Sequence, residues 1–394
     1  MTIDYVKSPL AFKVRKAARY VRLYGLNRTL WKVRGQYHMR RSFEALPKTP
    51  VERNPNSHVG LIGCGNFGYS NIAYYLRKSY GPVLRGCMDR NIGRAASLFQ
   101  DFKLDHYSDD AAAVLDDEKI DLVYIASNHA SHAEYAIAAL ERNKSVHIEK
   151  PHVVSFDQLE RLCAAMERST GAVGLGFNRP NSRIGRLMRE ALAGQTGATM
   201  LNWFIAGHAI DEDHWYFKKE EGGRVLGNLC HWTDLIYQCI PPEARYPITI
   251  TPTRTLKSDS DIAVTYTFGD GSIAALTFSA KGHTFEGVRE RFAAHRGDVL
   301  IFMDDFQSLI IETNAEKKDL SSHQRDHGHQ AAIRYSYDAA KTEPGDPFRL
   351  PVSYIWESGE LFLRTKEALD TDTQQRVEAY ASRTPAASAG ARAL

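Results

Sequence analysis

The chain has 394 residues, of which 43% are hydrophobic and 25% are charged, so it is long enough to bury the cores of two domains of ordinary size. No apolar run approaches the roughly 20 residues of a membrane span, and the first residues lack the apolar block of a signal peptide. The five cysteines stand singly, without C-x-x-C pairs, which is typical of reduced thiols and not of disulfides or a zinc site. We therefore predict a soluble, cytoplasmic protein with no bound metal.

Residues 1–56 form a basic arm and a linker. Residues 1–50 hold 12 lysines and arginines against Asp4 and Glu44, a local charge of +10, although the whole chain has a net charge of only +3. A basic arm on a mildly acidic body indicates an attachment segment. No recognisable nucleic-acid-binding module accompanies this charge, so we expect no nucleic-acid partner.

An amphipathic helix is predicted within residues 8–41 of this arm. Apolar side chains recur there at helical intervals between basic residues, at Leu10, Val14, Ala17, Ala18 and Val21. Such a helix can lie in the interface of an anionic membrane, which would place the protein at the inner face of that membrane. The simpler interpretation is that the helix packs on its own chain or on a twin subunit, with its basic face in water.

From residue 57 the pattern changes to short apolar strands that alternate with segments of helical length. We expect strands at 58–63, 83–88, 104–107, 121–126, 145–149 and 172–177, and helices at 68–78, 92–102, 129–142 and 155–168. This alternation predicts a doubly wound parallel sheet, which is a Rossmann domain over residues 57–178.

The first predicted strand runs into a glycine turn, Gly63-Cys-Gly65-Asn-Phe-Gly68. A G-x-G-x-x-G that closes a strand and opens a helix is the dinucleotide-binding fingerprint. Its glycines permit a tight turn, leave room for a pyrophosphate at the helix N-terminus, and let the helix pack closely on the strand. Asn66 and Phe67 lie in the same turn, so we expect them to contact the cofactor too.

Asp89 ends the second strand, at the distance of about 20 residues from the glycine turn that the fingerprint requires of its acidic residue. A carboxylate there accepts hydrogen bonds from the adenosine ribose, which favours NAD. Arg90 leaves NADP open, because an arginine beside this position can pair with a 2′-phosphate.

Two more stretches follow strands of the predicted sheet, at the edge where such sheets bind ligands. Ser127 and Asn128 leave the fourth strand toward the nicotinamide half of the cofactor. His132, early in the next helix, is either a cofactor contact or a surface residue. Glu149 and Lys150 end the following strand, at the mouth of the cofactor cleft.

Five motifs occur in a characteristic order: GCGNFG, IASNHASHAEYAIAALERNKSVHIEKP, GLGFNRP, GGRVLGNLCHWTDL and GDVLIFMDDFQSLIIE. Through them, roughly residues 57–370 resemble the glucose-fructose oxidoreductase, inositol dehydrogenase and rhizopine-catabolism (Gfo/Idh/MocA) family, in a branch associated with polysaccharide-related dehydrogenases. The resemblance implies a second α/β domain, at residues 179–375, whose open and mostly antiparallel sheet serves substrate binding and homo-oligomer contacts. Strand-like runs past residue 195 agree with it, with a hairpin at Asp270-Gly271. Residues 376–394 are predicted to form a flexible tail.

The implied activity is that of an NAD(P)-dependent oxidoreductase, which moves a hydride between a sugar hydroxyl carbon and nicotinamide. The resemblance assigns the catalytic lysine to Lys150 and the catalytic histidine to His231. An imidazole with an ordinary pKa of ~6.5 suits proton transfer, so His231 is favoured as the base and Lys150 as the cation on the reacting hydroxyl. The reverse assignment requires the pKa of Lys150 to fall by about 2–3 units. Asp234, one turn later, orients His231, or else the two merely satisfy one another at a domain boundary.

One departure from the family pattern lies in this helix: many relatives carry an aspartate where this chain has Gly227. At 100° per residue, Arg224, Asn228, His231 and Asp234 share its polar face. A guanidinium in the cleft would suit a nucleotide-linked or acidic sugar. Further candidates for substrate binding are Asn178, Arg179, His214 and Trp215.

Two other functions remain open from the sequence. A tightly held, recycled NAD would make the protein a sugar transhydrogenase or a redox-type glycosidase. The missing carboxylate also allows a non-catalytic nucleotide-binding partner protein that is anchored by its basic arm.

Overall fold

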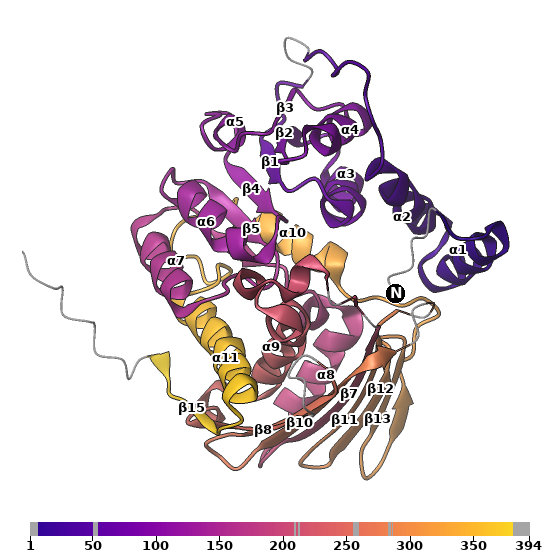
Figure 1. Cartoon of the computed structure of the whole chain (residues 1–394). Helices are drawn as coiled ribbons and strands as arrows, with labels where there is room; N and C mark the ends of the chain where they lie inside the picture. The colour runs from indigo at the N-terminus through magenta and orange to yellow at the C-terminus, as the bar shows by residue number, and fades with distance from the viewer. Residues whose placement is uncertain are drawn as a thin grey trace, which may run out of the picture.

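The computed structural model of the protein contains two sheets, each with helices packed against it (Figure 1). It describes residues 7–49, 54–208, 210–211, 213–254, 260–282, 285 and 287–380. Most of the predicted tail, residues 381–394, lies outside the described residues. The start of that tail was predicted wrongly, because Gln375–Val377 forms an edge strand in which Val377 pairs with Ile248 and is buried.

The first sheet has six parallel strands in the order β3-β2-β1-β4-β5-β6, which confirms the predicted Rossmann fold. Its strands are β1 (Val59–Ile62), β2 (Leu84–Met88), β3 (His106–Ser108), β4 (Leu122–Ile125), β5 (Ser145–Ile148) and β6 (Val173–Leu175). Every residue of β1, β4 and β5 is buried, because helices cover both faces of the sheet. These helices are α3 (Tyr74–Tyr80), α4 (Ile92–Phe102), α5 (Ala112–Leu115), α6 (His129–Leu140) and α7 (Phe156–Arg168).

The second sheet has nine strands and is antiparallel except where β7 pairs with β10, as predicted. Its strands are β7 (Met200–His208), β8 (Ile248–Arg254), β9 (Ile262–Thr267), β10 (Ile273–Gly282), β11 (Arg289–Arg296), β12 (Val299–Asp304), β13 (Ser308–Glu312), β14 (Lys317–Asp319) and β15 (Gln375–Val377). The predicted turn at Asp270-Gly271 joins β9 to β10, and Gly271 takes a φ of +85° there. One face packs against α8 (Arg183–Ala193), α9 (Cys230–Cys239) and α11 (Val352–Thr371).

Helix α10 (His329–Ala339) returns to the first sheet after strand β14 of the second sheet, and only the edge strand β15 follows it in that sheet. Its Ile333 and Tyr337 are buried in the core around β1 and β2. The hydroxyl of Tyr124 on β4 donates to the carbonyl of Ile333 at 2.7 Å, and Gly174 on β6 makes room for Ser336. A single division of the chain at residues 178/179 therefore describes the two sheets but not this helix.

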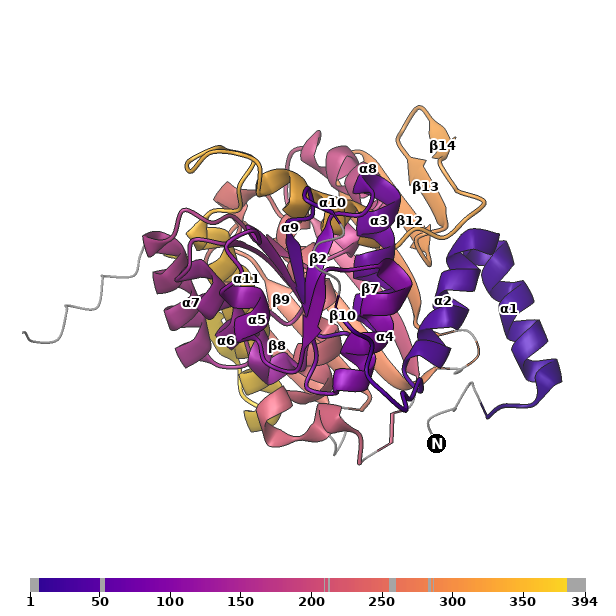
Figure 2. The same ribbon diagram turned by 90° about the horizontal axis from the view of Figure 1, so that it is seen from above.

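The basic arm forms a helical hairpin, α1 (Leu10–Tyr24) and α2 (Leu26–His38), which projects from the body of the molecule (Figure 2). Helix α2 packs on the first domain, where the Trp31 ring contacts the rings of Tyr69 and Phe102. The predicted apolar stripe of α1 does not pack on its own chain, because Leu10 and Val14 are exposed. Within the described residues, no helix is both long and apolar enough to cross a membrane.

Candidate cofactor and substrate site

The glycine turn after β1 has the shape that a dinucleotide needs. Gly63 has a φ of +96°, and a side chain there would meet the carbonyl of Ala126 at 2.4 Å. A Cβ on Gly68 would meet the carbonyl of Gly63 at 2.2 Å, so helix and strand are in close contact. A Cβ on Gly65 would have no described atom within 4 Å. The backbone is therefore open at the position where the fingerprint expects a pyrophosphate.

Around this turn, Asn66 accepts a hydrogen bond from Ser70 at 3.0 Å, and the ring of Phe67 lies 5.8 Å from that of His329. Asp89 follows β2 directly, and its two carboxylate oxygens accept from the backbone N–H groups of Cys64 and Asn91, each at 2.8 Å. Each oxygen keeps a further acceptor site, which a ribose hydroxyl can use. These residues fit NAD.

The side chain of Arg90 is exposed beside Asp89. Its contact with a 2′-phosphate stays a prediction, and so does the choice between NAD and NADP that depends on it.

The N-terminal hairpin fastens this turn, which the sequence did not reveal. His38 at the end of α2 donates from Nε2 to the carbonyl of Cys64 at 2.7 Å, and its Nδ1 accepts from Ser97 at 2.9 Å. Burial lowers the pKa of His38, which keeps this neutral tautomer. A Cβ on Gly35 would lie 3.5 Å from the side chain of Asn66 in the turn and 3.0 Å from the Cβ of Ser70 in the helix that follows it. The predicted attachment arm is thus also a brace for the cofactor-binding turn.

The ends of β4 and β5 are tied together by His132, which is buried. Its two ring nitrogens lie 2.8 Å from the carbonyl of Pro151 and 3.1 Å from that of Ser127. Burial rules out the alternative that His132 is a surface residue, and its contact with the cofactor stays a prediction. The Ser127 side chain bonds to Ser131, while the Glu149 carboxylate lies against Gly176.

Glu221, which sequence reasoning missed, caps the N-terminus of α6 from the second domain. Its carboxylate accepts from the side chain of Asn128 at 2.7 Å and from the backbone of Ala130 at 3.2 Å. Its carbonyl accepts from Nδ1 of His129 at 2.9 Å. A negative charge is favourable at a helix N-terminus, so this buried contact holds the two domains together beside the end of β4.

Lys150 reaches from the end of β5 to the second domain, where its Nζ donates to the carbonyl of Gly227 at 2.7 Å. Burial alone would lower its pKa, but Tyr216, Cys230 and Glu149 together outweigh this effect, and the pKa of Lys150 is raised. The side chain therefore stays a cation at neutral pH.

Two aromatic rings fill the space beside Gly227. A Cβ there would lie 2.6 Å from Cε1 of His129 and 2.9 Å from Cε2 of Tyr216. The two rings contact one another at 4.7 Å, and burial lowers the pKa of His129 to about 2. The space beside Gly227, where the family resemblance implies a carboxylate, is thus filled by two rings, and neither ring was predicted as a site residue.

His231 and Asn228 lie near Gly227 on the same helix, which begins with a π-helical segment, Val225–Leu229. Nδ1 of His231 and Oδ1 of Asn228 are buried without a hydrogen-bond partner among the described residues. Burial, followed by the charges of Arg179 and Lys150, sets the pKa of His231 well below its usual 6.5. The imidazole is therefore neutral, and the two orphaned polar atoms fit a ligand that carries hydroxyl groups.

Asp234 does not orient His231, which corrects the prediction. Its carboxylate is turned toward α11, where it accepts from Tyr354 at 2.5 Å and from Ser358 at 3.1 Å, and Gln238 donates to it at 2.9 Å. Because these three donors already bind the carboxylate oxygens, Asp234 is not directed toward the imidazole of His231 one turn away. Burial raises the pKa of Asp234 to about 6, although these hydrogen bonds oppose the shift.

Asp234→Asn tests this burial. Folding raises the pKa of the carboxyl from 3.8 to about 6, so the folded state binds the proton more tightly and loses stability as pH rises between these values. The variant lacks this loss. Its free energy of unfolding, relative to that of the unsubstituted protein, should therefore rise by up to about 3 kcal/mol between pH 4 and pH 7. Urea unfolding at pH 4 and pH 7 measures the free energy of unfolding of both proteins. A difference between the two proteins that is the same at both pH values would contradict a buried carboxyl with a raised pKa.

Arg179 is held in a buried ion pair and is not open to a substrate, which corrects another prediction. Its guanidinium bonds to both oxygens of Glu290, at 2.7 and 2.8 Å, and lies over the ring of Trp232. Trp232 Nε1 donates to the same carboxylate at 2.6 Å. Asn178 is likewise buried, and it donates to the carbonyl of His327 at 2.6 Å. These groups support the segment that leads into α10.

The remaining predicted substrate contacts lie at the edges of the site. Trp215 is partly exposed and packs on His129 at 4.8 Å, while Nδ1 of His214 accepts from the backbone of Tyr216. Arg224 is buried, with its guanidinium 5.6 Å above the ring of Phe278 on the second sheet. Contact of these three residues with a substrate stays a prediction. The described residues contain no cluster of three or more groups that could hold a metal.

Parts of this chain are similar to known proteins. Residues 57–177 match the model of an oxidoreductase family with an NAD-binding Rossmann fold (GFO_IDH_MocA). Oxidoreductase P35 of Formosa agariphila is 30% identical over 135 residues, which are 34% of this chain and 41% of that protein. Inositol 2-dehydrogenase 2 of Saccharopolyspora erythraea is 28% identical over 184 residues, which are 41% of this chain and 54% of that protein.

The whole fold also has counterparts among solved structures. A levoglucosan dehydrogenase in complex with NADH and levoglucosan has a TM-score of 0.69 and 16% identity, and the match covers 82% of this chain and 99% of that one. The matches to the two curated relatives above span only about half of each relative's length. The first domain of the chain, residues 57–177, belongs to the Gfo/Idh/MocA oxidoreductase family, as the motifs predicted, and it is an NAD-binding Rossmann domain.

Proposed function

We propose that the protein is an NAD-dependent dehydrogenase that oxidises a C–OH group of a sugar or a related polyol. One observation carries this proposal. Where the two domains meet, the ammonium of Lys150 is 2.7 Å from the carbonyl of Gly227, and the same helix holds two buried polar atoms, on His231 and Asn228, that have no partner among the described residues. A hydroxylated substrate would satisfy them both.

The glycine turn and the end of β2 would hold the cofactor. The open backbone at Gly65 would receive the pyrophosphate, Asp89 the ribose, and Ser127 with Asn128 would face the nicotinamide half. When bound there, NAD supplies the acceptor for the hydride that leaves the substrate carbon.

Lys150 and His231 have different roles in this proposal. Lys150 stays protonated, so it binds the reacting hydroxyl and stabilises the negative charge that develops on its oxygen. His231 is a neutral imidazole, so it accepts the hydroxyl proton. Asp234 has no part in this step, because its carboxylate is engaged with α11.

Three further features support proposals about the setting of this reaction. The outward face of the second sheet exposes Met200, Phe204, Ile273 and Phe302, which suits contact with a second copy of the chain. All five cysteines are buried thiols, which suits the reducing cytoplasm. The guanidinium of Arg224 suits a substrate with a carboxylate or phosphate, such as an acidic or nucleotide-linked sugar of the kind used in polysaccharide assembly.

The experiment is an initial-rate assay of NADH formation with inositols, neutral sugars, sugar acids and nucleotide sugars, with NAD and NADP in parallel. We expect turnover with at least one class, and its loss in Gly65→Val, because the Cβ of this variant fills the open backbone at a point with no described atom within 4 Å. Protein that reduces neither cofactor with any compound, and whose melting temperature neither cofactor raises, would overturn the proposal. NAD that stays bound through dialysis, without net NADH formation, would indicate a transhydrogenase or redox-type glycosidase.

A further inference from the structure

The two helices of the N-terminal hairpin carry the same apolar pattern. Helix α1 has Leu10, Val14, Ala17 and Val21, and α2 has Leu26, Leu30, Val33 and Tyr37. The spacing i, i+4, i+7, i+11 places each set on one helix face. These side chains do not face the core, since Leu10 is 75% exposed, Val14 58%, Leu30 52% and Tyr37 54%. The hairpin thus presents two apolar stripes to solvent.

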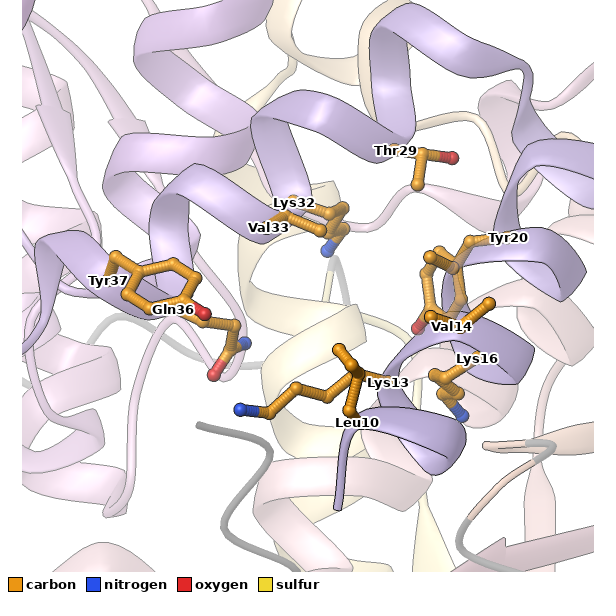
Figure 3. Close-up of a pocket in the computed structure, with 11 residues that line it drawn as sticks. Leu10, Lys13, Val14, Lys16, Tyr20, Thr29, Lys32, Val33, Gln36 and Tyr37 are labelled. Carbon is orange, nitrogen blue, oxygen red and sulfur yellow. The ribbon is translucent and has the colours of Figure 1, made fainter. Parts of the chain in front are cut away.

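A groove of about 360 Å³ lies between the two helices (Figure 3). Leu10 and Val14 line it from α1, and Val33 with Tyr37 line it from α2. The side chains of Lys13 and Lys32 also line it, so the apolar surface of the groove is bordered by ammonium groups.

The charge of the hairpin has one sign. Residues 7–41 contain eleven lysines and arginines and no acidic residue. Among the described residues, no carboxylate pairs with Lys13 or Lys32, and burial followed by the charge of Arg28 lowers the pKa of Lys32 to about 7. A negatively charged group in the groove would restore the full charge of Lys32.

The hairpin is held to the body by its other faces. Phe12 packs on Phe285 at 5.6 Å, and the backbone of Arg325 donates to the carbonyl of Leu23 at 2.9 Å. Trp31 anchors α2 on the first domain. The apolar stripes can therefore bind an external surface without being pulled out of a core.

We propose that the α1–α2 hairpin docks the protein on a bilayer of anionic phospholipid, with acyl chains against the two apolar stripes and headgroup phosphates on the flanking lysines and arginines. A lipid surface is favoured over a protein partner. A protein is usually recognised through charges of both signs at defined positions, whereas this hairpin carries only positive charge, spread over both helices. Interfacial helices bind through apolar area and through attraction to anionic headgroups, and both contributions are present here. This inference is independent of the proposed enzyme activity.

Flotation of the full-length protein with vesicles tests it. We expect binding to vesicles of phosphatidylserine and phosphatidylcholine, at least 10-fold weaker binding to pure phosphatidylcholine, and weakening by added salt. Leu10→Asn with Val14→Asn should lower the affinity at least 10-fold. The matched control is Phe348→Asn, which removes a side chain that is 44% exposed between α10 and α11, and this variant should bind like the unsubstituted protein.

Melting temperatures of both variants verify that they are folded. No binding to anionic vesicles, or binding that the Leu10→Asn/Val14→Asn variant retains, would overturn the proposal. Light scattering provides a further check. If the unsubstituted protein is an oligomer that does not bind lipid, and the Leu10→Asn/Val14→Asn variant is a monomer, the groove is a contact with a second copy of the chain and the proposal is overturned.

Discussion

Lys150→Met should lower kcat/KM for NAD-dependent oxidation by about 10²–10³-fold, as expected when a group that stabilises developing negative charge is removed. Methionine keeps most of the volume of the side chain but takes away the only donor that Lys150 offers to the Gly227 carbonyl and to the substrate oxygen. NAD affinity should change only a few-fold, because the glycine turn follows β1 and Asp89 follows β2, whereas Lys150 follows β5.

Steady-state kinetics with a titration of NAD measure both quantities. Activity within a few-fold of that of the unsubstituted protein, in a Lys150→Met variant that is folded, would remove Lys150 from the chemistry.

The pH profile of the unsubstituted enzyme provides a second measure of the same pair. The pKa of His231 is lowered, so the imidazole stays neutral as pH falls through 6.5, and the pKa of Lys150 is raised, so the ammonium persists as pH rises to 10.5. We therefore expect kcat/KM to be flat between about pH 6.5 and pH 9.

Gly227→Asp has the second large expected effect, and its direction is opposite to what the family pattern suggests. The aspartate that the family resemblance implies should not fit at this position, because a Cβ would lie 2.6 Å from the ring of His129 and 2.9 Å from that of Tyr216. We expect a loss of about 1–3 kcal/mol in stability from overpacking, with a further cost for the buried carboxylate, and a loss of activity.

The control for this substitution is Gly194→Asp, since a Cβ there meets nothing closer than 3.7 Å. Urea unfolding and activity assays compare the two variants. A Gly227→Asp variant that is as stable as the control and more active than the unsubstituted protein would contradict the structure at this position.

Much of the first domain could be predicted because its signals are local. Each strand is a short apolar run, and the glycine turn, the strand before it and Asp89 all belong to one βαβ unit, so they lie close together in the sequence. The glycines also have the steric surroundings that their spacing predicts, from the positive φ at Gly63 to the open space at Gly65. The turn at Asp270-Gly271 was identifiable for the same reason.

The errors concern contacts between distant segments. Arg179 looked available for substrate because its partner, Glu290, lies 111 residues away. Asp234 was assigned to His231 by helical proximity, whereas Tyr354 and Ser358 reach it from α11. The angular estimate also assumed a regular α-helix, but Val225–Leu229 is π-helical, and this changes the direction of its side chains. The hydrogen bond from His38 to the carbonyl of Cys64 could not be predicted either, because it forms only when α2 packs against the first domain.

The most direct test of the account uses a substrate from the NADH assay that carries deuterium at its C–OH carbon. We expect the deuterium to appear at C4 of the nicotinamide in the product NADH, and we expect Lys150→Met to form this product at least about 10²-fold more slowly. NADH that forms without deuterium, or deuterium transfer that is as fast in Lys150→Met as in the unsubstituted protein, would contradict it.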